Sequence, residues 1–405
     1  MTELSLVLDK CATFLLALCP ILQHYKGLFV NAAVTVLLLL FPYVMARLVK
    51  NNGVRIGELK IILPLIAFFL YRVVDHGTSI TEAGQAVVVI VYFLAITACL
   101  DTAFFVRVIT AVSLLASFCI AVQYVCYYIF DFHLQLVPTS LLIPRAEQWV
   151  LLAQTGRYSV TGKLMRFYRP SAFFLEPSHM FIYMFTPTAL QLLSDKPSRT
   201  RMIPLALMFG MVLTTSGMAI LTAAMLFLLF VGKKSGKRTK EFSLFRFLRV
   251  DTISIIAVFG LLCIAAFFTV PFLRNSVERI FSSGQDYSNA VSGRIASGWN
   301  VLKNMHGWQI LVGVQDGLGG ITASMSGFYE TMFEYGVIGI LISYAFFVHG
   351  LFKLKNGYFW AACIMIIASF FSQHTHSTMF LIYATFVFVD GYRKRKSETT
   401  GIAVL

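Results

Sequence analysis

The residues best suited to chemistry lie in a short segment at positions 167–179, which reads Phe-Tyr-Arg-Pro-Ser-Ala-Phe-Phe-Leu-Glu-Pro-Ser-His. This segment places Glu176 among apolar residues at the start of a long apolar run. Burial there would bring the pKa of the carboxyl toward that of a general base, and His179, three residues on, can lie on the same helix face. Glu176 and Ser178 equally suit the cap of a helix N-terminus. The segment therefore predicts either a catalytic base or a helix cap.

Arginines are concentrated in the two long segments between apolar runs, residues 131–178 and 272–330, where Arg outnumbers Lys by seven to two. A planar guanidinium binds phosphate through two parallel hydrogen bonds, so this bias indicates a phosphate or another oxyanion as ligand. The alternative is that each arginine is an ordinary solvated loop charge. The candidate phosphate-binding residues are Arg145, Arg157, Arg169, Arg279 and Arg294.

The second long segment supplies another carboxylate, Glu330, which ends the sequence Gly-Phe-Tyr-Glu at 327–330. A glycine-rich stretch precedes it, and glycine lets the backbone approach a bulky ligand closely, although flexible loops are rich in glycine for other reasons. The sequence contains no Walker loop, dinucleotide fingerprint, zinc motif or Asp-x-Asp pair. It therefore predicts no nucleotide or metal cofactor.

Membrane-spanning helices must position these residues. The chain has 405 residues, of which 58% are hydrophobic and 13% charged, whereas a soluble domain has roughly 25% charged residues. This composition excludes a cytosolic enzyme. The net charge of +14 is what cytoplasmic loops rich in Lys and Arg would give, and it does not indicate nucleic acid. All seven cysteines fall within apolar runs, with no spacing typical of disulfides or metal sites.

Two of the apolar runs, 203–231 and 358–389, have basic residues on both sides. The positive-inside rule places both flanks in the cytoplasm, so each run is predicted to be a hairpin of two short helices. The turns fall at 214–217 and 372–377, where the residues are polar. Arms of about 13–16 residues cover roughly 20–24 Å of a core about 30 Å thick, so both tips should lie below the outer surface. Polar backbone at that depth must be buried in protein or line a wet cavity.

The predicted fold is all-α, a polytopic integral membrane protein with about 12 transmembrane helices and two large periplasmic loops. Both termini are expected in the cytoplasm. The predicted organisation is five spans in 1–130, the first large loop at 131–178, spans with the first hairpin in 179–271, the second large loop at 272–330, and the last spans with the second hairpin and a basic tail in 331–405.

Three segments carry a resemblance to a known family: Arg-Pro-Ser-Ala-Phe-Phe-Leu-Glu-Pro-Ser-His at 169–179, Thr-Thr-Ser-Gly at 214–217, and the series from Ser-Gly-Arg to Glu-Tyr-Gly-Val-Ile-Gly at 292–339. They resemble the bacterial O-antigen and capsule repeat-unit polymerases. The resemblance implies a glycosyltransferase of the inner membrane that works at the periplasmic face without nucleotide sugar or metal. Such an enzyme moves a growing glycan from one undecaprenyl diphosphate carrier onto a repeat unit held by another. The implied partners are this lipid-linked donor and acceptor, the lipid bilayer, a chain-length regulator and a flippase, with no nucleic acid.

The resemblance also implies roles for the candidate residues. The arginines and Tyr329 would bind the diphosphate or another part of the substrate. Glu176 would accept the proton of the acceptor hydroxyl, with Glu330 and His179 as the other catalytic candidates. The family spacing of Arg, ten residues and Gly is met by Arg145 and Gly156.

Two other functions stay open. The O-antigen ligases share the architecture but usually carry a His-Asn-type motif where this chain has Ser-Gly-Phe at 326–328, which favours a polymerase. A lipid-linked oligosaccharide flippase or transporter is the alternative of a different class, because broken hairpins suit discontinuous helices. A membrane scaffold is disfavoured by the concentration of Arg and by the Glu-Pro-Ser-His sequence.

Overall fold

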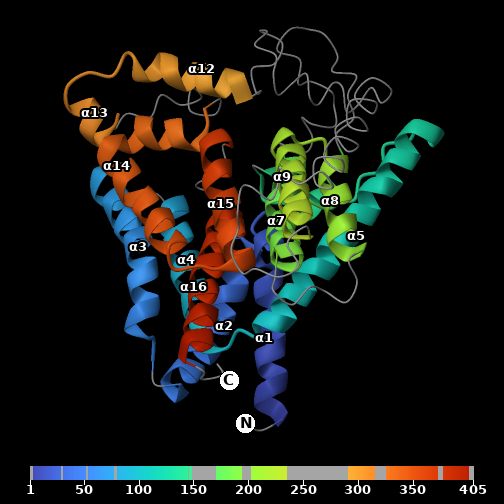
Figure 1. Ribbon diagram of the computed structural model, residues 1–405, viewed down its shortest axis with the longest axis horizontal. Coiled ribbons are helices and arrows are strands. Elements are labelled where there is room, and N and C mark those ends of the chain that lie inside the picture. The colour runs from blue at the N-terminus through green and yellow to red at the C-terminus, as the bar shows by residue number, and fades with distance from the viewer. Residues whose placement is uncertain are drawn as a thin grey trace.

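The computed structural model describes residues 3–28, 31–51, 53–76, 80–144, 146–147, 170–193, 202–234, 291–314, 325–372 and 377–400. Within these ranges the protein is an all-helical bundle without β-strands, as the sequence predicts (Figure 1). The helices are α1 (Glu3–Leu22), α2 (Ala32–Lys50), α3 (Ile56–His76), α4 (Ile80–Ala98), α5 (Thr102–Phe130), the 3-10 helix η1 (Thr139–Leu141), α7 (Pro177–Leu193), α8 (Met202–Leu213), α9 (Gly217–Lys234), α12 (Val291–Leu302), α13 (Trp308–Val312), α14 (Gly327–Leu351), α15 (Asn356–Phe371) and α16 (Thr378–Thr400).

Four of these helices, α1, α2, α5 and α14, are long and apolar enough to cross a membrane. Shorter apolar helices lie within α4, α8, α9 and α15. The chain is therefore a membrane protein by length and composition of its helices. The total of about 12 spans stays a prediction, because the apolar run at 251–271 is outside the described residues.

The chain breaks between α8 and α9 at residues 214–216, where the sequence predicts a turn. Thr214 is buried and its Oγ1 donates to the carbonyl of Met211 at 2.7 Å, while the Tyr124 hydroxyl of α5 donates to the carbonyl of Leu213 at 2.9 Å. Thr215 takes a left-handed φ of 54°. The terminal carbonyls of α8 thus obtain donors from side chains, which lets a helix end inside an apolar bundle.

The second hairpin pairs α15 with α16. Helix α15 ends at Phe371, and the amide of Gly327 at the start of α14 donates to the carbonyl of Ser372 at 2.7 Å. The predicted tip at 372–377 is described only at its two ends, since residues 373–376 are outside the described residues.

Helix α14 bends sharply at Gly336, which has a φ of 61° and a ψ of −164°. The nine-residue part before the bend, 327–335, lies across the end of the bundle, and the rest runs down beside α3 (Figure 1). A Cβ at Gly336 would lie 2.3 Å from the carbonyl oxygen of Leu311, so only glycine fits at this bend. The Tyr71 hydroxyl of α3 donates to the carbonyl of Tyr335 at 3.3 Å and so satisfies a backbone group that the bend releases.

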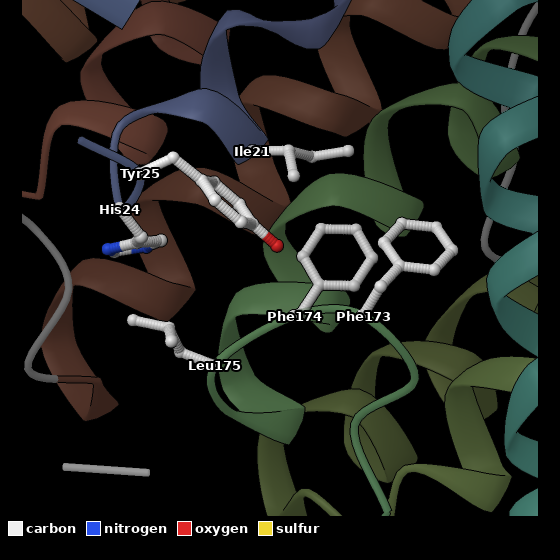
Figure 2. A pocket seen from close by; sticks show the side chains of 6 residues that line it. All are labelled: Ile21, His24, Tyr25, Phe173, Phe174 and Leu175. Atoms are coloured by element: carbon white, nitrogen blue, oxygen red, sulfur yellow. The ribbon is translucent and has the colours of Figure 1, made fainter. Parts of the chain in front are cut away.

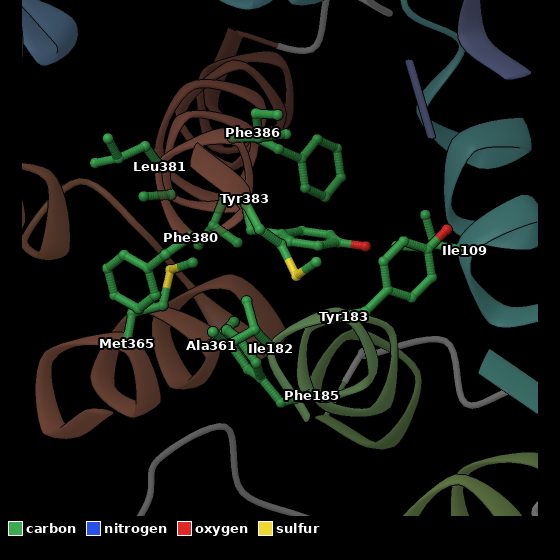
Figure 3. Packing of buried hydrophobic residues seen from close by; sticks show 14 of the residues in the cluster. Ile109, Ile182, Tyr183, Phe185, Ala361, Met365, Phe380, Leu381, Tyr383 and Phe386 are labelled. Carbon is green, nitrogen blue, oxygen red and sulfur yellow. The ribbon is translucent and has the colours of Figure 1, made fainter. Parts of the chain in front are cut away.

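Aromatic side chains of α7 and α16 pack together in the core of the bundle, several of them fully buried (Figure 3). Tyr92 of α4 is fully buried in the same core. Tyrosine hydroxyls from this core donate hydrogen bonds to carbonyls of α1. The carbonyl of Leu16 lacks its helical donor, because Pro20 has no amide hydrogen. The Tyr92 hydroxyl donates to that carbonyl at 3.2 Å, and the Tyr183 hydroxyl donates to the carbonyl of Ala17 at 2.9 Å.

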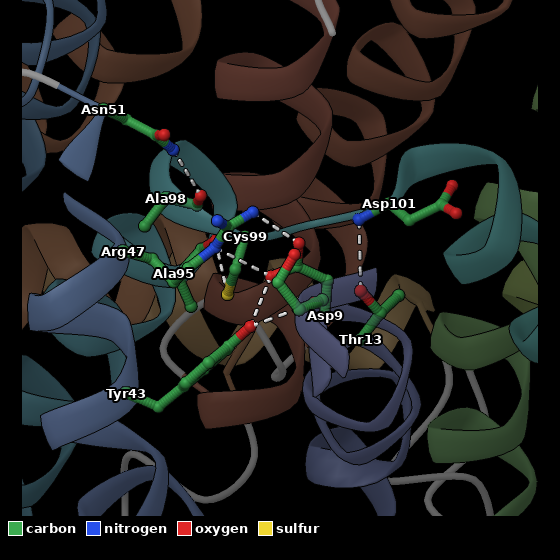
Figure 4. A network of polar contacts seen from close by, with 10 residues as sticks. Asp9, Thr13, Tyr43, Arg47, Asn51, Ala95, Ala98, Cys99 and Asp101 are labelled. Carbon is green, nitrogen blue, oxygen red and sulfur yellow. Dashed lines mark hydrogen bonds and ion pairs between the residues drawn. The ribbon is translucent and has the colours of Figure 1, made fainter. Parts of the chain in front are cut away.

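The end of the bundle that carries both termini is held by charged and polar contacts (Figures 1 and 4). Asp9 of α1 accepts two hydrogen bonds from Arg47 of α2, at 3.0 and 2.5 Å, and one from the Tyr43 hydroxyl at 2.7 Å. Asp390 of α16 likewise accepts from Thr102 of α5 and Tyr358 of α15, each at 2.6 Å. These contacts join five helices at one end.

Candidate functional site

Most of the predicted phosphate-binding arginines lie outside the residues that the structure describes. Arg145, Arg157, Arg169 and Arg279 are outside the described residues. Arg294 lies in α12, for which the backbone but not this side chain is described. Their roles stay predictions.

Glu176 and His179 lie together at the start of α7. The carbonyl of Glu176 accepts from the amides of His179 at 3.1 Å and Met180 at 3.2 Å, and its carboxylate accepts from the Ser178 hydroxyl at 2.9 Å. Pro177 takes the first helical position, where its missing amide hydrogen costs nothing. This is the backbone position of a helix cap, yet the carboxylate bonds a hydroxyl and keeps the acceptor capacity that a base needs. Both interpretations of Glu176 therefore remain open.

The imidazole of His179 stacks on that of His24, with ring centroids 4.8 Å apart and an interplanar angle of 23°. His24 also lines a shallow indentation formed by two segments far apart in sequence (Figure 2). Its lining residues are Ile21, His24, Tyr25, Phe173, Phe174 and Leu175. The lining is mainly apolar.

A second polar group is built around Arg72 of α3, which is 7% exposed. Its Nε donates to the Tyr335 hydroxyl of α14 at 2.8 Å, and its Nη1 donates to Oε1 of Gln85 in α4 at 3.3 Å. The guanidinium also lies over the rings of Tyr335 and Phe68, 5.3 and 5.8 Å from their centroids. Three helices thus hold one cation in a fixed orientation.

Glu330 joins this group from the part of α14 that precedes the bend. It is half-buried, and it lies close enough to Arg72 and Glu334 for the charges of both to act on its carboxyl. Glu330 and Glu334 are four residues apart on one helical segment, so they share a face. We name Arg72, Gln85, Glu330, Glu334 and Tyr335 the Arg72 cluster.

The sequence did not predict three members of the cluster, namely Arg72, Gln85 and Tyr335. The available signal was that Arg72 is an ionisable residue within the apolar run at 59–74. Such residues usually face the interior of a bundle and pair there with other polar groups.

Tyr329, the predicted substrate-binding tyrosine, packs against α12. A Cβ at Gly298 of that helix would lie 2.3 Å from Cγ of the tyrosine ring. The ring also packs against the buried side chains of Met305, Met325 and Phe333. The structure gives Tyr329 a packing role and leaves its predicted binding role untested.

Among the described residues, no three His, Cys, Asp or Glu side chains come close enough together to hold a metal ion. The chemistry of the Arg72 cluster is that of a fixed cation whose charge acts on the Glu330 carboxyl. Such a pair of functions can stabilise an oxyanion and accept a proton.

Comparison with known families and with curated proteins gives no match to this chain.

Proposed function

We propose that this protein is a membrane glycosyltransferase that polymerises oligosaccharide repeat units linked to undecaprenyl diphosphate. It would act at the periplasmic face of the bacterial inner membrane. One observation carries the proposal: Arg72, near the end of α3, is close enough to Glu330, before the bend of α14, for its charge to act on that carboxyl. These parts of α3 and α14 lie at the end of the bundle opposite the termini, which the positive-inside rule assigns to the periplasm. The family resemblance of residues 169–179 and 292–339 supports the same function.

The chemistry assigned to the cluster follows from the reaction. An acceptor hydroxyl attacks the anomeric carbon of the donor glycan, and the bond between that carbon and the diphosphate oxygen breaks. The electron pair leaves on the diphosphate, whose negative charge Arg72 and the loop arginines stabilise. The hydroxyl proton passes to Glu330, which we prefer as base because it is the carboxylate beside the fixed cation. Glu176 is the alternative base.

Two structural features favour a second candidate, a flippase for lipid-linked oligosaccharides. Arg72 is a buried ionisable residue in a predicted span, and the α8–α9 helix pair is interrupted by three polar residues. Transporters use buried ionisable residues and interrupted helices to bind charged substrates inside the membrane. A flippase would move the lipid-linked unit without changing its covalent structure.

Deletion of the gene in its own cells distinguishes these functions. A polymerase mutant should carry single repeat units on the lipid at the outer face of the inner membrane and no longer chains. A ligase mutant would carry long lipid-linked polymer that is never transferred onward. A flippase mutant would keep single units at the inner face.

The single units from the deletion cells then serve as substrate for the purified full-length protein in vesicles. Formation of a ladder of lipid-linked products supports the proposal, and release of free undecaprenyl diphosphate should accompany each added unit. If the single units stay unextended while the same vesicles move them across the bilayer, the flippase is the better assignment.

A further inference from the structure

The short helix α13 and the turn before it expose several large apolar side chains. All residues from 306 to 311 are exposed. Trp308 is 76% exposed, and Ile310 and Leu311 are 43% and 42% exposed. We call these three residues the α13 apolar edge. The sequence places them in a periplasmic loop, where such a group would face water.

Contacts with two helices fix the position of α13 along the length of the bundle. The Tyr71 hydroxyl of α3 lies 3.5 Å from the carbonyl oxygen of Val312, the last residue of α13. Tyr71 is in the last two turns of α3, which ends at His76. The amide of Val314 donates to the carbonyl of Phe333 at 2.8 Å, just before the bend of α14. Helix α13 therefore lies beside the outer ends of α3 and α14.

The same two helices also expose large apolar side chains. Leu70 of α3 is 62% exposed and Leu341 of α14 is 65% exposed. On a membrane-spanning bundle these are faces that lipid covers. Figure 1 shows α13 at the outer edge of the bundle, next to the bend of α14. Helix α13 thus exposes apolar side chains beside helices that expose apolar side chains themselves.

The opposite side of this region is already used for internal packing. Val301 and Leu302 of α12 and the buried Met305 pack with Phe333 of α14. The exposed side chains of α13 take no part in that packing, so the fold itself does not require them to be apolar. Trp is the residue type most typical of the boundary between hydrocarbon and headgroups, because its ring is amphipathic.

We propose that the α13 apolar edge is immersed in the outer interface of the lipid bilayer, so that this part of the second large loop is a membrane anchor and not an aqueous loop. The partner is the lipid surface. The proposal is independent of the function proposed above.

Fluorescence of Trp308 tests the proposal in the full-length protein. The other three tryptophans, Trp149, Trp299 and Trp360, are replaced by Phe, and the protein is reconstituted into phosphatidylcholine vesicles. Lipids brominated close to the headgroup should lower the Trp308 emission by about twofold or more, and aqueous iodide should lower it little. Strong iodide quenching with no effect of bromolipids would overturn the proposal. Protection from both quenchers would overturn it as well, because it would mean that protein covers the edge.

A second measurement guards against loss of folding in the tryptophan variants. Spin labels are placed one at a time at Ile310, at Leu70 as the lipid-facing control, and at Asn304 of the α12–α13 connection as the water-facing control. The label at 310 should be more accessible to oxygen than to a nickel chelate, as at 70. Accessibility at 310 that matches 304 would contradict the proposal.

Discussion

At the scale of single residues, Arg72 is the cation around which the candidate site is built. A guanidinium is costly to bury, and it is kept inside a bundle only when its donors find acceptors. Here Gln85 and Tyr335 supply two acceptors, and the guanidinium carbon lies over the rings of Phe68 and Tyr335. The orientation of the cation is therefore set by protein contacts before any substrate arrives, which is the condition for effective electrostatic stabilisation.

Replacement of Arg72 by Lys should separate charge from geometry. Lysine keeps the positive charge but cannot bond Gln85 and Tyr335 in the same plane. We expect product formation to fall at least about tenfold, which corresponds to roughly 1.4 kcal/mol of transition-state stabilisation. The control is Arg107→Lys, because Arg107 of α5 bonds only its own helix through Ala103 among the contacts described. Equal activity of the two variants would leave Arg72 with a structural role alone.

The two candidate bases are compared directly by Glu330→Gln and Glu176→Gln. The amide is nearly the size of the carboxylate and still accepts a hydrogen bond, but it cannot take a proton at neutral pH. We expect Glu330→Gln to bind lipid-linked substrate and lose most turnover. We expect Glu176→Gln to keep turnover per folded molecule and to lose on the order of 1 kcal/mol of stability. The reverse pattern in product ladders and melting curves would transfer the role of base to Glu176.

The ion pair of Asp9 and Arg47 makes a prediction about stability. Both side chains are about one-tenth exposed, so removal of one partner leaves the other charge poorly compensated. Asp9→Asn should destabilise the protein by about 3 kcal/mol, and Tyr43→Phe by about 1 kcal/mol. Lys10→Gln, which changes the exposed neighbour of Asp9, is the control. Thermal unfolding in detergent measures all three, and an Asp9→Asn midpoint equal to that of the control would refute the assignment.

At the scale of elements, the bend of α14 is the feature that brings carboxylates and cation together. The part of α14 before Gly336 carries Glu330 and Glu334 across the end of the bundle, and the part after it packs on α3 beside Arg72. A straight helix would send the two carboxylates along the axis and away from α3. The Tyr71 hydroxyl bonds the carbonyl just before the bend, and the backbone of Leu311 and Gly313 lies close against Gly336.

Gly336→Ala tests how much the bend depends on glycine. The new Cβ would meet the Leu311 carbonyl at 2.3 Å in a left-handed conformation, so we expect a loss of about 3 kcal/mol or more and a displaced Glu330. Gly84→Ala in α4 is the control, because no atom lies within 4 Å of a Cβ built there. That change should be neutral or slightly stabilising, since Ala has the higher helix propensity. The comparison is made by melting temperature in detergent and by product yield.

The sequence predicts the secondary-structure elements better than it predicts the Arg72 cluster. Charge on both flanks of 203–231 is enough to predict a turn, and the structure breaks the helix at 214–216. The bend at Gly336 cannot be read locally, because it depends on contacts with α3 and with the end of α13. The Arg72 cluster is harder still, since Arg72 and Tyr335 are 263 residues apart. A pairing at that separation is set by the packing of α3 on α14, which no local pattern encodes.

At the scale of the whole molecule, the two ends of the bundle differ in kind. The end with the termini is closed by paired charges, with the Arg393 side chain 3.6 Å from Glu58 in addition to the contacts of Asp9 and Asp390. The opposite end holds the Arg72 cluster, the start of α7 and the α13 apolar edge. This division is what we expect if the proposed activity lies at one face of the membrane and paired charges hold the helices together at the other.

Labelling of single cysteines in a cysteine-free background tests this orientation. Residues 234 and 394, at the basic ends of α9 and α16, should react only from the cytoplasm. Residue 285, which lies outside the described residues, should react from the periplasm. Periplasmic labelling at 234 would remove the hairpin assignment of α8 and α9 and change the number of spans.

The distance along the chain between Arg72 and Tyr335 has a consequence for biogenesis. At ordinary rates of translation about 15–50 s separate the synthesis of the two residues, so α3 enters the membrane long before its partner in α14 exists. Of the two side-chain acceptors described for the guanidinium, Gln85 is the one synthesised first, only 13 residues after Arg72. We therefore expect α3 and α4 to insert as a pair, with Gln85 shielding the charge while the ribosome completes the chain. Removal of that amide should then reduce the yield of inserted protein more than it reduces the stability of the finished molecule.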